Sequence, residues 1–189
     1  RESERKFRSA FESVSVGMVL TSPSGELMRA NAAFGQMLGR SVAEVQAVNF
    51  ADLTHPDDVD ISFRHVRAML EGETDKASFS KRYVHRAGHP VWTDVSTILL
   101  RDSLGEPLHF VTHVQDITER KKMAEALQNE RDLLRMLIDN IPDTIYFKDT
   151  AGHFTMINQA QADMLGLDDA EEAIGHTDFD YFTPEHAQD

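Results

Sequence analysis

β-branched and aromatic residues gather in five short segments of the chain, as they do in β-strands. Turns that contain glycine or proline separate the segments, and apolar residues at helical spacing lie between the second and the third. The segments are residues 16–21, 26–30, 76–86, 91–101 and 107–115. This order of elements predicts an α+β fold with an antiparallel sheet.

Polar residues at fixed offsets mark where the helices begin and end. Asn31 is placed to cap one helix, and Ser41 with Glu44 forms the capping box of the next. Pro56 suits the first turn of a longer helix that Gly72 ends. The helices are predicted over residues 3–12, 31–38 and 56–72, with a short one after Ser41.

From Thr118 to about Asn140 the chain loses glycine and proline and fills with residues that favour helices. Six positions are spaced by 4, 3, 4, 3 and 4 residues, which is the spacing of a coiled-coil seam. They are Met123, Leu127, Glu130, Leu134, Leu137 and Ile141. Glu130 is the one polar residue in this seam. The spacing of the other five predicts a linker helix over 118–141 and a homodimer that forms through this helix and the N-terminal one. The alternative, in which the same side chains pack on their own domain, stays open.

Part of the pattern recurs at a constant offset of 127 residues, the separation of Asn31 and Asn158. At that offset Gly25 aligns with Gly152 without gaps, and the motif Met-Leu-Gly at 37–39 aligns with 164–166. The repeat predicts three parts: a first domain, a linker helix, and the first half of a second domain of the same kind. Their expected limits are 1–117, 118–141 and 142–189.

Composition narrows the possible functions. Among 189 residues, 19 are basic and 32 are acidic, and the net charge of −13 opposes binding to nucleic acid or anionic membranes. The absence of cysteine excludes disulfides and thiolate chemistry. No apolar run approaches the roughly 18 residues that span a bilayer, and no signal peptide opens the chain, so we expect a cytoplasmic location without direct membrane contact.

Several motifs, in order, resemble those of a PAS domain of the sensory-box type. They are residues 7–12, Gly17-Met18, 24–31, His55-Pro-Asp-Asp58, 82–88, Val91-Trp92 and the run Val114-Gln-Asp-Ile-Thr-Glu-Arg-Lys121. The resemblance covers residues 4–121 as a whole domain and 135–189 as the first half of another. It implies a five-stranded sheet in the order 2-1-5-4-3, with helices on one face enclosing a small pocket.

The resemblance also implies a function. The chain is expected to be the sensory and dimerisation region of a bacterial signalling protein of the histidine kinase or diguanylate cyclase type. It carries no catalytic motif, so we expect it not to be an enzyme. Asp116, Ile117 and Thr118 would relay the state of the last strand to the linker helix. In the family this aspartate makes a salt bridge to the sheet.

Strand parity carried over from the family assigns a possible pocket. Its expected lining comes from the helices and from the inner face of the sheet: Met37, Phe50, Leu53, His65, Tyr83, Thr93, Thr112 and Val114. The result is a mostly apolar cavity with two hydroxyls and a phenol. Such a space could hold a small molecule. If side chains fill it instead, the chain would be a ligand-free structural dimerisation module.

No cofactor is expected. The family's flavin-binding members have a reactive cysteine where this chain has Phe50, and their amides fall on Tyr83, Thr93 and Val114. The axial histidine of the haem-binding members falls on Ile61, although His65, one turn later, offers the alternative of a haem-based gas sensor. No metal site is expected, because His85 with His89, and His109 with His113, would lie too far apart along a strand.

Overall fold

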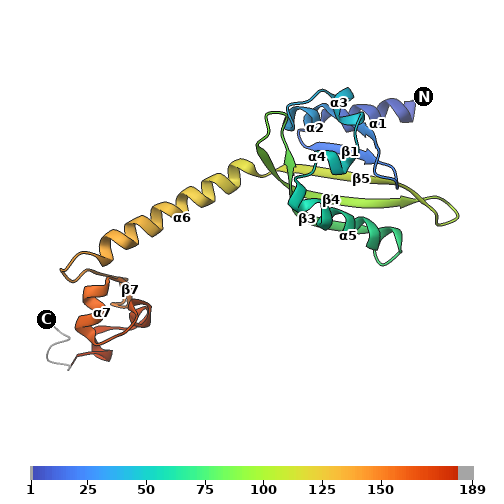
Figure 1. Ribbon diagram of the computed structural model, residues 1–189. Helices are drawn as coiled ribbons and strands as arrows, with labels where there is room; N and C mark the ends of the chain where they lie inside the picture. The colour runs from blue at the N-terminus through green and yellow to red at the C-terminus, as the bar shows by residue number, and fades with distance from the viewer. Residues whose placement is uncertain (1, 183–189) are drawn as a thin grey trace. The chain divides into compact units, whose positions relative to one another are not determined.

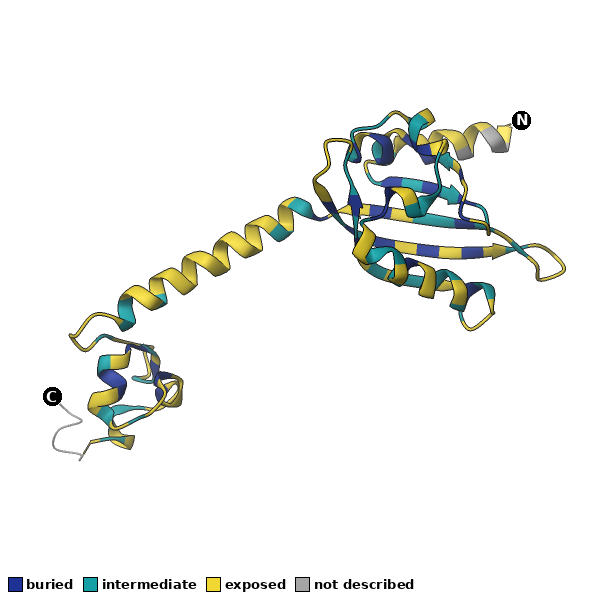
Figure 2. Cartoon of the chain, viewed as in Figure 1, coloured by how far each residue is buried: buried dark blue, intermediate teal, exposed yellow. Residues whose placement is uncertain are grey.

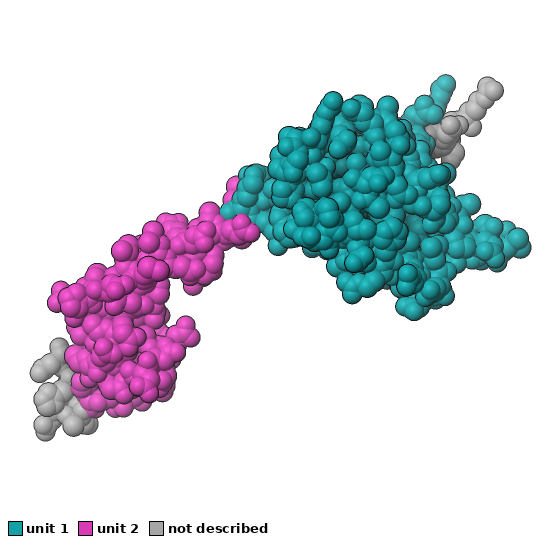
Figure 3. Space-filling model, viewed as in Figure 1, with its two compact units in different colours: residues 1–122 teal, residues 123–189 magenta. Residues whose placement is uncertain are grey.

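The computed structural model describes residues 2–182, except for the side chains of residues 3, 4 and 7. The chain divides into two compact units, Arg1–Lys122 and Met123–Asp189 (Figure 3). Each unit has its own hydrophobic core, so each is described by itself. No described helix is both long and apolar enough to cross a lipid bilayer.

The first unit is built on a five-stranded antiparallel sheet in the order β2-β1-β5-β4-β3 (Figure 1). The strands are β1 (Gly17–Thr21), β2 (Leu27–Ala30), β3 (Lys76–Val84), β4 (Pro90–Arg101) and β5 (Pro107–Asp116). The predicted fold class and strand order are therefore confirmed.

One face of this sheet is buried and the other is open. Along β4, Val91, Val95 and Leu99 are buried, whereas Ile98 is 51% exposed, because successive side chains of a strand point to opposite faces. The alternation is visible along the strands in Figure 2. Helices cover the buried face, and it is on this face that a cavity forms.

The helices of the first unit are short, and polar caps set their limits. They are α1 (Glu2–Ser13), α2 (Ala32–Met37), α3 (Val42–Gln46), α4 (Phe50–Leu53), the 3-10 turn η1 (Pro56–Asp58) and α5 (Val59–Leu70). Asn31 and the Ser41–Glu44 capping box start α2 and α3, as predicted. The single helix predicted over 56–72 is instead a 3-10 turn followed by α5. Helix α4 was not predicted; Asn49 and Asp52 form its capping box.

Asn31 fixes the start of the fold with four hydrogen bonds. Its Oδ1 accepts from the backbone N–H of Met18 (2.9 Å) and of Phe34 (3.0 Å). Its Nδ2 donates to the carbonyls of Phe11 (3.1 Å) and Val16 (2.9 Å). One buried side chain therefore joins α1, β1 and α2.

The second unit repeats the first part of this fold: a helix, a β-hairpin and a short helix capped by an asparagine. It contains most of α6 (Thr118–Asp139) and then β6 (Tyr146–Lys148), β7 (Phe154–Ile157), α7 (Gln159–Leu165), η2 (Ala170–Ala173) and η3 (Asp178–Asp180). Strands β6 and β7 pair as an antiparallel hairpin. Asn158 caps α7 by accepting from Gln161 N–H, and its Nδ2 donates to the carbonyls of Ile138, in the last turn of α6, and of Ile141, just after it.

Candidate functional site

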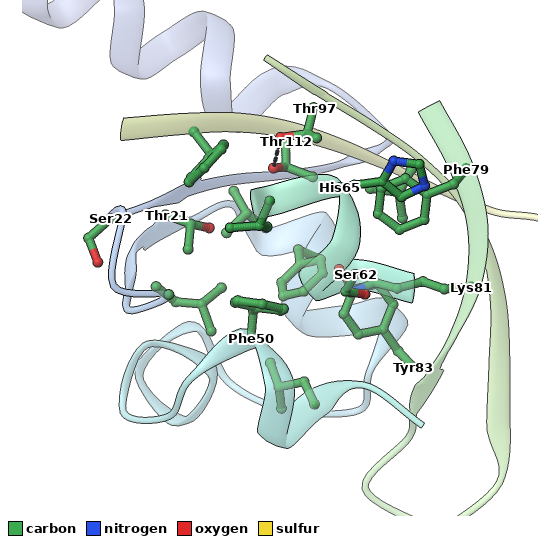
Figure 4. A pocket seen from close by; sticks show the side chains of 18 of the residues that line it. Thr21, Ser22, Phe50, Ser62, His65, Phe79, Lys81, Tyr83, Thr97 and Thr112 are labelled. Atoms are coloured by element: carbon green, nitrogen blue, oxygen red, sulfur yellow. Dashed lines mark hydrogen bonds between the residues drawn. The ribbon is translucent and has the colours of Figure 1, made fainter. Parts of the chain in front are cut away.

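A cavity of about 60 Å³ lies between the buried face of the sheet and the helices α4 and α5 (Figure 4). Val19, Val95 and Phe110 contribute apolar surface from three strands, and Phe50 and Leu53 contribute it from α4. The cavity is therefore mostly apolar, and its few polar groups decide what it can bind.

Five of the eight residues expected to line a pocket do line this cavity: Phe50, Leu53, His65, Tyr83 and Thr112. Met37, Thr93 and Val114 do not. Thr93 and Val114 point inward as expected, but both are fully buried, and the Thr93 hydroxyl donates to the carbonyl of Lys81 (2.9 Å). Met37 packs against the main core cluster. Thr93 and Val114 are both packed in the core beside residues that do line the cavity, since Thr93 lies opposite Lys81 and Val114 lies opposite Val95.

Two hydroxyls of the cavity are paired with each other, and its imidazole is stacked on a phenyl ring. Thr97 and Thr112, which are directly opposite each other on β4 and β5, share a hydrogen bond of 2.9 Å. The ring of His65 stacks on that of Phe79, with 4.3 Å between the centroids and 15° between the planes. The Thr97–Thr112 pair therefore needs no ligand to complete its hydrogen bond.

Lys81 is the charged group of the cavity, and it was not predicted. It is only 3% exposed, and its Nζ donates to Thr54 Oγ1 (3.0 Å) and to Ser62 Oγ (3.2 Å). The Nζ also lies 4.3 Å from the centroid of the Tyr83 ring. Burial lowers the pKa of Lys81 to about 7. The available signal was its position on β3, at the same parity as Phe79 and Tyr83.

Asp58 is the carboxylate whose charge raises the pKa of Lys81, but this carboxylate is already bonded to Arg82. Both of its carboxylate oxygens accept from the guanidinium of Arg82, at 2.7 and 2.9 Å, and Oδ2 also accepts from the Arg82 N–H (2.7 Å). These bonds hold the pKa of Asp58 below its usual value. They also explain the motif at 55–58, since they fix the start of α5 to β3. Among the described residues, no carboxylate forms an ion pair with Lys81.

The junction between the sheet and α6 consists of Asp116, Ile117 and Thr118. Ile117 is buried, and its N–H donates to the carbonyl of Trp92 (2.8 Å). Thr118 Oγ1 accepts from the Trp92 N–H (3.0 Å), and the Thr118 N–H donates to Asp116 Oδ1 (2.8 Å). The end of β5 and the start of α6 are thus tied to the neighbouring strand β4.

The salt bridge implied for Asp116 does not form. In the described part of the chain, its carboxylate forms no ion pair and caps α6 instead. An ion pair between the sheet and α6 forms instead at Asp94 of β4, which pairs with Arg120 at 2.9 Å. Lys121 adds a cation–π contact with Trp92, at 4.5 Å from the ring centroid.

No residue of α6 is buried among those described (Figure 2). The five apolar residues of the expected seam are between 39% and 68% exposed, and Glu130 is exposed as well. The alternative in which these side chains pack on their own domain therefore has no support in the single chain.

The residues present do not fit haem. A volume of about 60 Å³ is far below the several hundred Å³ of usual cofactor pockets, and His65 is stacked on Phe79. We therefore derive no haem-dependent step for this chain. The expectation that His85 and His89 lie far apart along a strand is wrong, because they flank a turn and their rings stack at 4.3 Å.

The model of the PAS fold family matches residues 11–122 and, separately, residues 138–189. The probable diguanylate cyclase DgcE of Escherichia coli is 35% identical over 127 residues, which are 67% of this chain and 12% of that protein. The sensor histidine kinase TmoS of Ectopseudomonas mendocina is 24% identical over 71% of this chain and 14% of its own length. The match thus spans about an eighth of the length of these two relatives.

Solved structures agree with the fold. A sensory box histidine kinase/response regulator from Burkholderia thailandensis is 27% identical, has a TM-score of 0.53, and aligns over 69% of this chain and 98% of its own. A PAS domain from Colwellia psychrerythraea is 18% identical, has a TM-score of 0.57, and aligns over 63% and 99%. The resemblance inferred from the motifs is confirmed: the chain belongs to the PAS fold family and is a sensory domain similar to those of diguanylate cyclases and histidine kinases.

Proposed function

We propose that the first unit is a small-molecule sensor that passes the state of its cavity to α6. The observation that carries this proposal is the path of β5. Phe110 and Thr112 of this strand line the cavity, and the same strand ends at Asp116, so that one residue separates it from α6. A displacement of β5 by a ligand would therefore act directly on the first turn of the helix.

The hydrogen bonds at the junction support this route. Trp92 of β4 bonds to both Ile117 and Thr118, so the start of α6 follows the position of two strands and not of one. The Asp94–Arg120 ion pair adds a second link from β4 to the first turn of α6. Because a signalling equilibrium needs a bias of only a few kcal/mol, small shifts at these contacts would suffice.

We also propose that α6 pairs with the α6 of a second copy. The exposed apolar residues recur at seam spacing, and a coiled coil would bury them. Glu130 weakens the seam at its centre, which leaves two arrangements of the pair close in free energy. The ligand state of the first unit would then select between them and inform a kinase- or cyclase-type output.

A double-mutant cycle with amide hydrogen exchange tests the route from the cavity to the helix. Thr112→Val removes the hydroxyl that bonds to Thr97, and Thr118→Val removes the acceptor of the Trp92 N–H. We expect Thr112→Val to change exchange of residues 117–122 by about 2- to 30-fold, and to change it much less in the Thr118→Val background.

The matched control is His113→Gln, an exposed position of the same strand on the open face. It should leave exchange of residues 117–122 unchanged. If Thr112→Val has no effect on these amides, β5 does not carry the signal, and the chain would be a ligand-free dimerisation module.

A further inference from the structure

Lys81 lies in a place that is unfavourable for a positive charge. It is buried in the wall of a mostly apolar cavity, and both of its hydrogen-bond acceptors, Thr54 and Ser62, are neutral hydroxyls. Moving an ammonium group out of water is costly unless a counter-charge is near. The nearby carboxylate of Asp58 is bonded to Arg82, so it forms no ion pair with the Lys81 ammonium.

The ammonium group also has unused hydrogen-bonding capacity. It carries three N–H donors, of which two are accounted for by Thr54 and Ser62. Figure 4 shows Lys81 extending from β3 so that its tip lies beside Ser62, on a different side of the cavity from the Thr97–Thr112 pair. Since that pair is satisfied internally, Lys81, with its charge and its third N–H, is the group that an anionic ligand would engage.

The size and surface of the cavity limit what can bind there. About 60 Å³ accommodates four to six water-sized groups, at roughly 10–15 Å³ each. Val19, Leu27 and Val95 supply apolar walls around this space. A suitable ligand has one anionic end and a short hydrocarbon end, with about four to six non-hydrogen atoms in all.

We propose that Lys81 binds the carboxylate of a short-chain monocarboxylic acid of two to four carbons, whose alkyl end occupies the apolar part of the cavity. This proposal deepens the proposed sensory function and rests on it, because it names the class of molecule sensed. The carboxylate accepts the third N–H of the ammonium and supplies the missing counter-charge. A dicarboxylate would bury a second charge among apolar side chains, and an aromatic acid exceeds the space.

Calorimetric titration of the whole chain with propionate tests the proposal. At pH 6.5 the ammonium is mostly protonated, because the pKa of Lys81 is about 7. We expect saturable binding of propionate and no binding of propionamide, which has nearly the same shape but no charge. Lys81→Met should weaken the affinity for propionate by about 10- to 150-fold, the range of one charge-assisted hydrogen bond.

Lys76→Met is the matched control, since Lys76 lies on the same strand with its side chain exposed on the open face. It should bind propionate as the unaltered chain does. NMR of the Lys81 side chain provides a second measurement that needs no variant: the pKa of its ammonium should rise when propionate binds.

The proposal is overturned if propionate does not bind at millimolar concentration, if propionamide binds equally well, or if the Lys81 resonance does not respond to saturating propionate. These outcomes leave the relay untouched, because hydrogen exchange after Thr112→Val tests it separately. A working relay without carboxylate binding would mean that the sensor takes another ligand.

Discussion

Lys81 illustrates what a single residue of this fold can contribute. Its neighbours at the same parity on β3 are Phe79 and Tyr83, so the strand directs its ammonium into the core. Thr54 and Ser62 stabilise it there by hydrogen bonds, and the Tyr83 ring adds a cation–π contact. An environment of this kind favours the neutral amine, so keeping Lys81 charged in the core has a cost: it lowers the free energy of unfolding.

That cost should depend on pH. In the unfolded chain a lysine titrates near 10.4, whereas the pKa of Lys81 is about 7 in the folded chain. Between these values the unfolded chain binds more protons, so this group makes the free energy of unfolding rise with pH, by at most about 1.4 kcal/mol per unit. Urea unfolding at pH 6.5 and 9 should show the rise in the unaltered chain and in Lys76→Met, and lose it in Lys81→Met.

Other groups near Lys81 bear on this measurement. Asp58 and Arg82 stay ionised over the range, and burial raises the pKa of Tyr83, which affects stability only above about pH 10. His65 also lines the cavity, and it is common to all three chains and cancels in the comparison. Parallel pH profiles for the unaltered chain and Lys81→Met would contradict the assignment of this charge to the core.

Strand parity explains how much of the site could be predicted. It identified the inner face correctly, since Tyr83, Thr93, Thr112 and Val114 all point inward. It says nothing about how far helices fill the space above each residue, so it could not separate the cavity at Thr112 from the packed core at Val114. Lys81 has the same parity, but a charged residue is rarely fully buried, and composition alone favours the surface.

At the scale of elements, the sequence predicted those with strong local signals. The strands and α6 agree with prediction to within about two residues. Helix α4 is only four residues long and has no periodicity to detect, so the Asn49–Asp52 capping box was its one signal. The break between η1 and α5 follows from the Asp58–Arg82 bonds, which are tertiary and invisible in local sequence.

Asn31 caps α2 in the first unit, and Asn158 caps α7 in the second. Replacing each asparagine should therefore affect one unit only. Asn31→Ala leaves two N–H and two carbonyl groups without their partner, so we expect the first unit to lose about 3–5 kcal/mol of unfolding free energy. Asn158→Ala should destabilise the second unit instead. Hydrogen exchange resolved by unit measures both effects.

Asn129→Ala serves as the control for this pair, because Asn129 is an exposed residue of α6. It should change protection in neither unit by more than about 0.5 kcal/mol. Equal loss of protection in both units after Asn31→Ala would show that they unfold as one cooperative body, contrary to the division of the chain into two units.

At the scale of the whole molecule, α6 is the element shared by the two units. One end is fixed to the first unit by the bonds of Ile117 and Thr118 to Trp92. The other end is fixed to the second unit, where Asn158 donates to the carbonyls of Ile138 and Ile141. The same kind of asparagine bond joins α1 to the first unit through Phe11, so each sensory unit is attached to the helix that precedes it.

The exposed seam of α6 provides the prediction for the assembled molecule. In a parallel pair of helices, two copies of Glu130 would face each other at a position that favours apolar residues, and their charges would repel. Glu130→Leu replaces this repulsion with apolar contact, worth about 1.5–3 kcal/mol for each leucine buried. Sedimentation equilibrium should therefore show a dimer dissociation constant at least tenfold lower. Glu125→Leu adds the same side chain on the opposite side of the helix, outside the seam, and should leave dimerisation unchanged; a similar gain from both variants, or from neither, would show that the pair does not form along this face.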